Sequence, residues 1–192
     1  MKIYTRKGDD GTTGLLYGGR VAKDSAVIAA NGAVDETQAA LGMVRALVER
    51  ESELDTLLVW LERDLYVLMA ELATAAANRP KLTPGVSLVT AEMVAAVEAR
   101  IDDLTGRFPP IKDFVIPGHD GVSAGLDVAR TVARRAEREA LAAADPESEV
   151  VPYLNRLSDL LWTMARWQEG GDSLLSRQAR ARTEDPSLEV KS

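Results

Sequence analysis

The chain of 192 residues contains no cysteine, which excludes disulfide bonds, thiolate nucleophiles and cysteine-ligated metals. It has one histidine, His119, which is too few for a histidine-rich metal site or for the paired Glu-x-x-His motifs of di-iron bundles. His119 is either an acid–base group or an ordinary structural residue. Runs of 18 apolar residues are also absent, so the sequence predicts no membrane span.

An excess of positive charge is lacking too. Acidic residues outnumber basic ones by 30 to 23, which gives a net charge of −7. This balance argues against a general affinity for nucleic acid, although it permits a local basic patch. The first ten residues lack the apolar core of a secretion signal, so we expect a cytoplasmic protein with no membrane or nucleic-acid partner.

Strand-like alternation is nearly absent, whereas apolar residues recur at steps of three and four. Proline-rich stretches predict loops at 78–87 and 106–121. The pattern predicts five helices, at about 24–50, 54–77, 90–104, 122–144 and from after Pro146 to about 170. We therefore expect an all-α, five-helix bundle in a single domain, 1–170, with a glycine-rich lead at 1–23 and a polar, mobile tail at 171–192.

The fourth helical segment contains the sequence ARTVARRAERE. At 100° per residue, Arg130, Arg134 and Arg138 form one stripe, with Glu137 beside it. This stripe borders the apolar stripe, which is Leu126, Ala129, Ala133, Ala136 and Ala140. Three like charges at steps of four repel one another unless an anion offsets them. The pattern indicates either a salt-bridged solvent face or an anion-binding groove between helices or subunits.

Polar residues also border the apolar stripes of the first and fifth helices. Asp35, four residues after Asn31, can pair with an arginine of a neighbouring helix or serve as an ordinary polar flank. Asn155, Asp159 and Arg166 share one face of the fifth helix. Their position near the seam indicates either a role beyond packing or pairing with the arginines of the fourth helix.

The opening stretch YTRKGDDGTTG, at 4–14, is too polar and glycine-rich for the interior of a helix or strand. It lacks the Gly-Lys-Ser/Thr spacing of a Walker A loop. Its glycines let backbone N–H groups approach an anion, and Arg6, Lys7 and Lys23 supply positive charge. The stretch is either a phosphate-binding loop or a simple turn.

Taken together, these stretches resemble the PduO-type ATP:cob(I)alamin adenosyltransferases. Five motifs carry the resemblance in the family's order: YTRKGDDGTTGLLYGGRVAKDS (4–25), NGAVDETQAALG (31–42), FVIPG (114–118), ARTVARRAER (129–138) and YLNRLSDLLWTMAR (153–166). The resemblance implies a homotrimer of five-helix bundles with a nucleotide-binding N-terminal loop and active sites between subunits. It implies transfer of the 5′-deoxyadenosyl group of ATP to cobalamin, in the form of cob(I)alamin, with release of triphosphate.

The resemblance also implies roles for individual residues. Its ATP-binding set is Thr5, Arg6, Lys7, Gly8, Asp9, Gly11, Thr12, Thr13, Lys23, Arg134, Glu137, Arg138 and Asn155. Its corrinoid set is Phe114, Asp35, Arg130 and Asp159. Glu137 would help to hold Mg²⁺, and Asp35 would pair with Arg130 at the subunit boundary. Phe114 would displace the lower base of the corrinoid to give a four-coordinate Co(II) that is easier to reduce. Arg134, Asp35, Arg130 and Phe114 would be the catalytic residues.

The resemblance also implies two protein partners. They are a flavin-type cob(II)alamin reductase and an adenosylcobalamin-dependent mutase or dehydratase. The chain departs from the family pattern at His119, at Asp127 where many members have histidine, and at Trp162 where phenylalanine is usual. These departures leave the nucleotide site intact and bear on the corrinoid contacts. Two alternatives to the adenosyltransferase function remain. One is a carrier that holds ATP or adenosylcobalamin without turnover, and the other is a helical module that binds nucleic acid.

Overall fold

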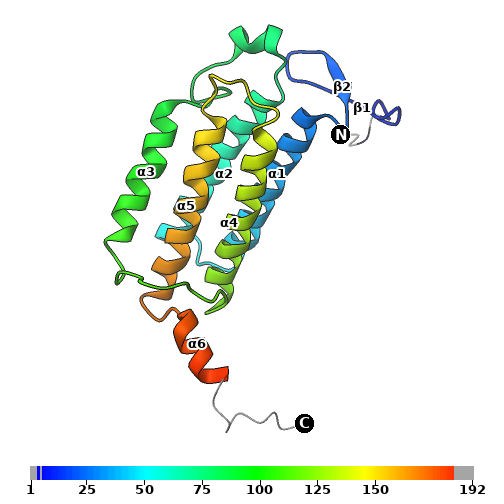
Figure 1. Ribbon diagram of the computed structural model, residues 1–192. Coiled ribbons are helices and arrows are strands. Elements are labelled where there is room, and N and C mark those ends of the chain that lie inside the picture. The colour runs from blue at the N-terminus through cyan, green and yellow to red at the C-terminus, as the bar shows by residue number, and fades with distance from the viewer. Residues whose placement is uncertain (1–3, 5, 184–192) are drawn as a thin grey trace, which may run out of the picture.

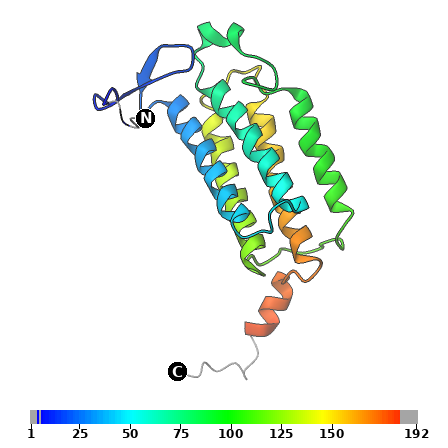
Figure 2. The same ribbon diagram turned by 180° about the vertical axis from the view of Figure 1, so that it is seen from behind.

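The computed structural model describes residue 4 and residues 6–183, which form a bundle of parallel and antiparallel helices (Figures 1 and 2). The long helices are α1 (Ala26–Arg45), α2 (Glu53–Leu72), α3 (Ala91–Thr105), α4 (Gly121–Ala140) and α5 (Val150–Glu169). Helix α4 packs against both α1 and α5, while α2 packs on α1 and α3 packs on α5. The expected helical architecture is confirmed, and α4 is its central helix.

The small side chains of α4 allow its neighbours to approach closely. Its expected apolar stripe is fully buried, as are Leu58, Leu61, Leu65 and Leu68 of α2. A Cβ atom added to Gly125 of α4 would lie 2.8 Å from Cγ2 of Val44 in α1, so only glycine fits at this crossing. At the end of α5, Gly170 has φ 60° and forms a left-handed cap, close to the helix end that the sequence predicts.

Several helix boundaries differ from expectation because side chains distant in sequence fix the connections. Helix α2 ends at Leu72, and the 3₁₀ helix η1 (Ala76–Lys81) follows where a loop was expected. Buried Glu71 accepts hydrogen bonds from the Val89 N–H at 2.7 Å and the Ser148 hydroxyl at 2.6 Å, and it pairs with Arg79 at 3.2 Å. This single carboxylate joins the α2–α3 and α4–α5 connections, and the local periodicity of the sequence does not predict such a contact.

Helix α1 is also shorter than expected, because it ends at Arg45 rather than near Arg50, and the α1–α2 connection is correspondingly longer. The Asp55 carboxylate accepts from Arg45 Nε at 2.8 Å and from the Glu51 N–H at 3.0 Å, which closes a non-helical turn. Similarly, α4 ends at Ala140 rather than near 144, and α5 begins at Val150 rather than directly after Pro146.

A hairpin in the lead and a helix in the tail were also not expected from the sequence. The lead contains a short antiparallel hairpin of β1 (Thr12–Gly14) and β2 (Arg20–Ala22), which lies beside the N-terminal end of α1 (Figure 1). The tail, expected to be mobile, contains α6 (Ser176–Thr183) beyond the opposite end of the bundle. Within the described residues, no helix combines the length and apolarity needed to cross a bilayer.

Candidate active site

The arginines of α4 differ in what they contact. Arg135 forms an ion pair with Glu36 of α1. Arg134 and Arg138 are exposed, and neither has a carboxylate partner within the described part of the chain. Arg138 Nη1 donates only to the Arg134 carbonyl oxygen, at 2.9 Å. Arg134 and Arg138, two of the three arginines in the predicted stripe, therefore present positive charge that no carboxylate of the described residues offsets.

Glu137 lies between these arginines and α5. Its Oε1 accepts a hydrogen bond from Asn155 Nδ2 at 2.8 Å, and both side chains are half-buried. The partner of Asn155 on α4 is thus a carboxylate, not an arginine as one interpretation of the sequence had it. The Asn155 amide oxygen accepts from Arg156 Nη1 at 2.7 Å, so both ends of the amide are fixed.

A pocket of about 460 Å³ joins the lead to α1. Thr13 and Lys23 from the lead and Asp35 from α1 line it, together with Asn31. Gly8 lies against the Lys23 side chain, because an added Cβ would lie 3.1 Å from Lys23 Nζ. The fold therefore brings together predicted residues from two distant stretches. Among the described residues, Asp35 makes no hydrogen bond or ion pair.

Arg20, which the sequence interpretation missed, organises the rest of the lead. Its guanidinium donates to the Lys7 carbonyl oxygen and to the Thr12 hydroxyl, the latter at 2.6 Å from Nη2. The Asp10 carboxylate accepts from the Thr12 hydroxyl and N–H, at 2.8 and 2.9 Å. These two hydrogen bonds lower the pKa of Asp10, and the bond from the Thr12 hydroxyl has the larger effect. The signal that could have identified Arg20 is its place directly after two glycines that end a turn.

Other predicted residues of the lead lie at its surface. Arg6, Asp9 and Gly11 are exposed, and Gly11 has φ 81°, which favours glycine. Thr5 lies outside the described residues.

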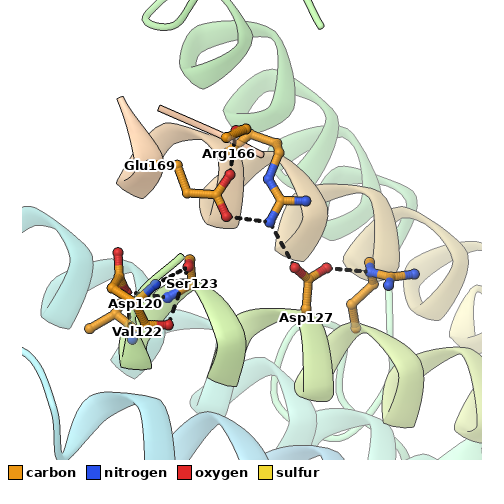
Figure 3. Close-up of polar contacts among 8 residues, drawn as sticks. Asp120, Val122, Ser123, Asp127, Arg166 and Glu169 are labelled. Atoms are coloured by element: carbon orange, nitrogen blue, oxygen red, sulfur yellow. Dashed lines mark hydrogen bonds and ion pairs between the residues drawn. The ribbon is translucent and has the colours of Figure 1, made fainter. Parts of the chain in front are cut away.

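Asp127, Arg166 and Glu169 form a buried ionic network between α4 and α5 (Figure 3), and the partly exposed Arg130 pairs with its Asp127. Arg130 Nε lies 3.0 Å from Asp127 Oδ1, and Arg166 Nη2 lies 2.7 Å from Asp127 Oδ2 and 2.8 Å from Glu169 Oε1. Asp127, Arg166 and Glu169 are all buried. Within one chain, the partner of Arg130 is thus Asp127, a departure from the family pattern, and not Asp35.

Phe114 and Asp159 lie apart from these groups. Phe114 is 85% exposed, on the loop that leads into the N-terminal end of α4. Asp159 lines a groove of about 530 Å³ between α3 and α5, where its Oδ2 lies 3.2 Å from Arg156 Nη1. Trp162 lines the same groove and contacts Phe108 edge to face, with 6.5 Å between ring centroids. One chain therefore does not bring Asp159 and Arg130 together.

The fold is a helical bundle with exposed guanidinium groups on α4 and a glycine-rich lead beside α1. The sequence profile of the family described as cobalamin adenosyltransferase matches residues 3–168. The chain belongs to this family and is an enzyme of the corrinoid adenosyltransferase class.

Curated relatives agree with this assignment. The corrinoid adenosyltransferase of Mycobacterium tuberculosis is 41% identical over 189 residues, covering 91% of this chain and 97% of the relative. That of Citrobacter freundii is 42% identical over 171 residues, covering 88% and 95%.

Solved structures show the same fold. A variant PduO-type ATP:corrinoid adenosyltransferase from Lactobacillus reuteri, complexed with cobalamin and ATP, superimposes with a TM-score of 0.81 at 29% identity. The alignment covers 92% of this chain and 99% of that one. Another variant of that enzyme, complexed with ATP, gives a TM-score of 0.79 at 28% identity, covering 91% and 100%.

Proposed function

We propose that this enzyme transfers the 5′-deoxyadenosyl group of ATP to cob(I)alamin, forming adenosylcobalamin and releasing triphosphate. The observation that carries the proposal is the exposed pair Arg134 and Arg138, without carboxylate partners in the described chain, beside the Glu137–Asn155 contact. A polyphosphate would offset the repulsion between these two guanidinium groups and accept bidentate hydrogen bonds from them.

The chemistry explains why no serine, cysteine or histidine nucleophile is needed. Cob(I)alamin is itself a strong nucleophile, and its electron pair forms the cobalt–carbon bond to the ribose C5′. The C5′–O bond breaks, and the leaving triphosphate takes that electron pair. Arg134, Arg138 and Lys23 stabilise the negative charge that grows on the leaving group. Alignment of the two substrates supplies much of the remaining acceleration.

The lead contributes to ATP binding mainly through Thr13 and Lys23, which line the pocket with Asp35. The Thr12 hydroxyl is already engaged by Asp10 and Arg20, so we assign Thr12 to the shape of the lead. The other lead residues of the predicted set, Thr5, Arg6, Lys7, Gly8, Asp9 and Gly11, would then surround the nucleotide as the lead folds over it.

Glu137 would hold Mg²⁺ against the triphosphate, where the cation neutralises phosphate charge. Its carboxylate is half-buried and fixed by Asn155, which suits a single protein ligand. Mg²⁺ commonly keeps waters and binds through one or two carboxylates plus substrate phosphates. The described residues contain no cluster of three acidic or histidine side chains, which fits a cation held chiefly by the nucleotide.

The complete site forms between two subunits of a homotrimer. In the described part of one chain, no hydrogen bond or ion pair joins the pocket of Thr13, Lys23 and Asp35 to the Glu137–Asn155 pair. Contact between neighbouring subunits would join the two halves and would let Asp35 of one subunit meet Arg130 of the next. Asp159 would reach the corrinoid from α5.

Phe114 would act as a wedge, that is, an apolar side chain that displaces the lower base of the corrinoid. Its ring is 85% exposed in one chain, and an apolar side chain without cover suits contact with the lower face of the corrin ring. Displacing the lower base would leave four-coordinate Co(II), which a flavin-type reductase can reduce. Adenosylcobalamin would then pass to a mutase or dehydratase that uses it.

An anaerobic assay tests the proposal. The purified protein is mixed with chemically reduced cob(I)alamin and MgATP, and the visible spectrum is followed for adenosylcobalamin. We expect product that depends on ATP, with triphosphate released in equal amount. Formation of orthophosphate and pyrophosphate in place of triphosphate, or no product while calorimetry still detects ATP binding, would contradict the proposal.

A further inference from the structure

The segment 174–177, called the strap here, lies against the loop that carries Phe114. The Ser176 N–H donates to the Phe114 carbonyl oxygen at 2.8 Å, and the Ile116 N–H donates to the Leu174 carbonyl oxygen at 2.8 Å. Val115 and Leu175 thereby form an antiparallel bridge. The strap thus holds the backbone directly after Phe114, from its carbonyl group to the Ile116 N–H.

The Asp113 side chain closes the same contact. Its Oδ1 accepts from the Phe114 N–H at 2.8 Å and from the Ser176 hydroxyl at 3.0 Å. Its Oδ2 accepts from the Arg177 N–H at 3.3 Å. The side chain is only 15% exposed, and the bond from the Phe114 N–H is the main cause of the lowered pKa of Asp113. One carboxylate therefore joins the loop to the first turn of α6.

The other end of the strap is anchored in the bundle. The hydroxyl of Ser173, directly before the strap, donates to the Glu169 carboxylate. Glu169 belongs to the buried network of Arg166, Asp127 and Arg130 (Figure 3). The strap is thus connected to the arginine that the proposed site assigns to the corrinoid.

We propose that Asp113 and the strap are positioning elements that hold Phe114 in place against the corrin ring. The inference rests on the proposed function, because it assumes the wedge role of Phe114. With 85% of its surface exposed, the Phe114 ring is held by its backbone rather than by packing. A wedge on an untethered loop would be pushed aside by the base that it has to displace. The family match ends at residue 168, so it does not cover the strap.

Two variants remove the tether by different routes. Asp113→Ala removes the three hydrogen bonds that this carboxylate accepts and its ion pair with Arg177 Nε at 3.4 Å. Ser176→Pro removes the N–H and hydroxyl donors at the first residue of α6, a position where proline is compatible with a helix. Asp113→Asn keeps one acceptor oxygen and serves as the conservative variant. Asp172→Ala is the matched control, because this nearby exposed carboxylate makes no hydrogen bond or ion pair in the described chain.

Each variant is assayed by two routes, cob(II)alamin with reduced flavin and chemically supplied cob(I)alamin. We expect Asp113→Ala and Ser176→Pro to lose about tenfold on the cob(II)alamin route, as for a misplaced group, and less than about twofold on the other. Asp113→Asn should fall between, and Asp172→Ala should match wild type. The spectrum of four-coordinate Co(II), recorded with MgATP, should weaken in parallel.

Phe114→Ala is the reference that separates two failures. If Phe114→Ala loses equally on both routes, the wedge role is wrong, and the inference falls with that part of the proposed function. If Phe114→Ala shows the difference between routes and the two tether variants behave like wild type, only the inference is overturned. Equal losses of the tether variants on both routes would also overturn it, since they would indicate general damage to the fold.

Discussion

The two ends of α4 use arginine in opposite ways. Toward the N-terminal end, Arg130 lies against Asp127, which a buried Arg166 also contacts. Toward the C-terminal end, Arg134 and Arg138 are exposed and have no carboxylate partner in the described chain. Both groups lie on one helix within about 12 Å along its axis.

The difference separates charge that the fold pairs internally from charge that it leaves exposed without a carboxylate partner in the described chain. A buried arginine without a carboxylate would be very costly, so the fold supplies two, Asp127 and Glu169. Exposed arginines at a step of four repel one another only weakly in water, so the fold tolerates them. An anionic substrate would then gain interactions that the protein itself does not use.

The largest effect expected concerns the buried end. Asp127→Ala should lower the free energy of unfolding by about 3 kcal/mol or more, because it leaves Arg166 buried with one carboxylate instead of two. Glu36→Ala, which removes the partner of exposed Arg135, should cost less than about 1 kcal/mol. Urea unfolding at one fixed protein concentration measures both. Equal costs would remove the distinction between the two ends.

The next effect concerns the exposed end. Arg134→Ala should reduce kcat/KM for ATP about 10²- to 10³-fold, as loss of a charge-stabilising donor does. Arg135→Ala is the matched control on the same helix, and it should lose less than about threefold because its ion pair with Glu36 is exposed. Steady-state kinetics with cob(I)alamin and MgATP gives both values. Near wild-type activity of Arg134→Ala would reject its assignment to the triphosphate.

The sequence predicted one end of α4 better than the other. The positions of Arg134 and Arg138 follow from helical periodicity and the identity of α4, and both are local features. The buried network could not be predicted in this way. Arg166 was placed on a polar face, yet it is 98% buried because the small residues of α4 admit its side chain between the helices. Which carboxylate an arginine meets depends on packing between helices, which one helical period does not encode.

The difference between local pattern and contacts distant in sequence also explains which parts of the fold were predicted wrongly. The apolar stripe of α4 was predicted correctly because its residues repeat every three or four positions. The ends of α2 and α4 were not, because Glu71 fixes the connections around them through contacts distant in sequence. The lead hairpin was missed because its strands have three residues each, too few for an alternating pattern.

A smaller effect is expected at Asp35, which lies on α1 and is exposed in one chain. If Asp35 pairs with Arg130 of a neighbouring subunit, Asp35→Asn should raise the KM for the corrinoid by about fivefold, the effect of an ion pair worth about 1 kcal/mol. The KM for ATP should change less. Kinetics with each substrate varied in turn measures the two constants. An unchanged corrinoid KM would contradict the pairing and would leave Asp127 as the sole acidic partner of Arg130.

The smallest effect concerns a carboxylate that, unlike Asp127, forms no ion pair in the described chain. Asp64 accepts a hydrogen bond from the Tyr153 hydroxyl at 2.9 Å, and burial raises its pKa above the ordinary value of 3.8. Because the folded-state pKa is the higher one, protonated Asp64 favours the fold below pH 3.8. This contribution is lost as the pH rises through the folded-state pKa.

Asp64→Asn should therefore gain stability relative to wild type as the pH rises from 4 to 7, because the amide cannot ionise while its oxygen can still accept from Tyr153. We expect a gain below about 1 kcal/mol, since the site is only partly buried. Urea unfolding at several pH values measures it, with Asp102→Asn on the exposed face of α3 as the control. A difference between Asp64→Asn and wild type that does not change with pH would show that burial of Asp64 costs the fold nothing.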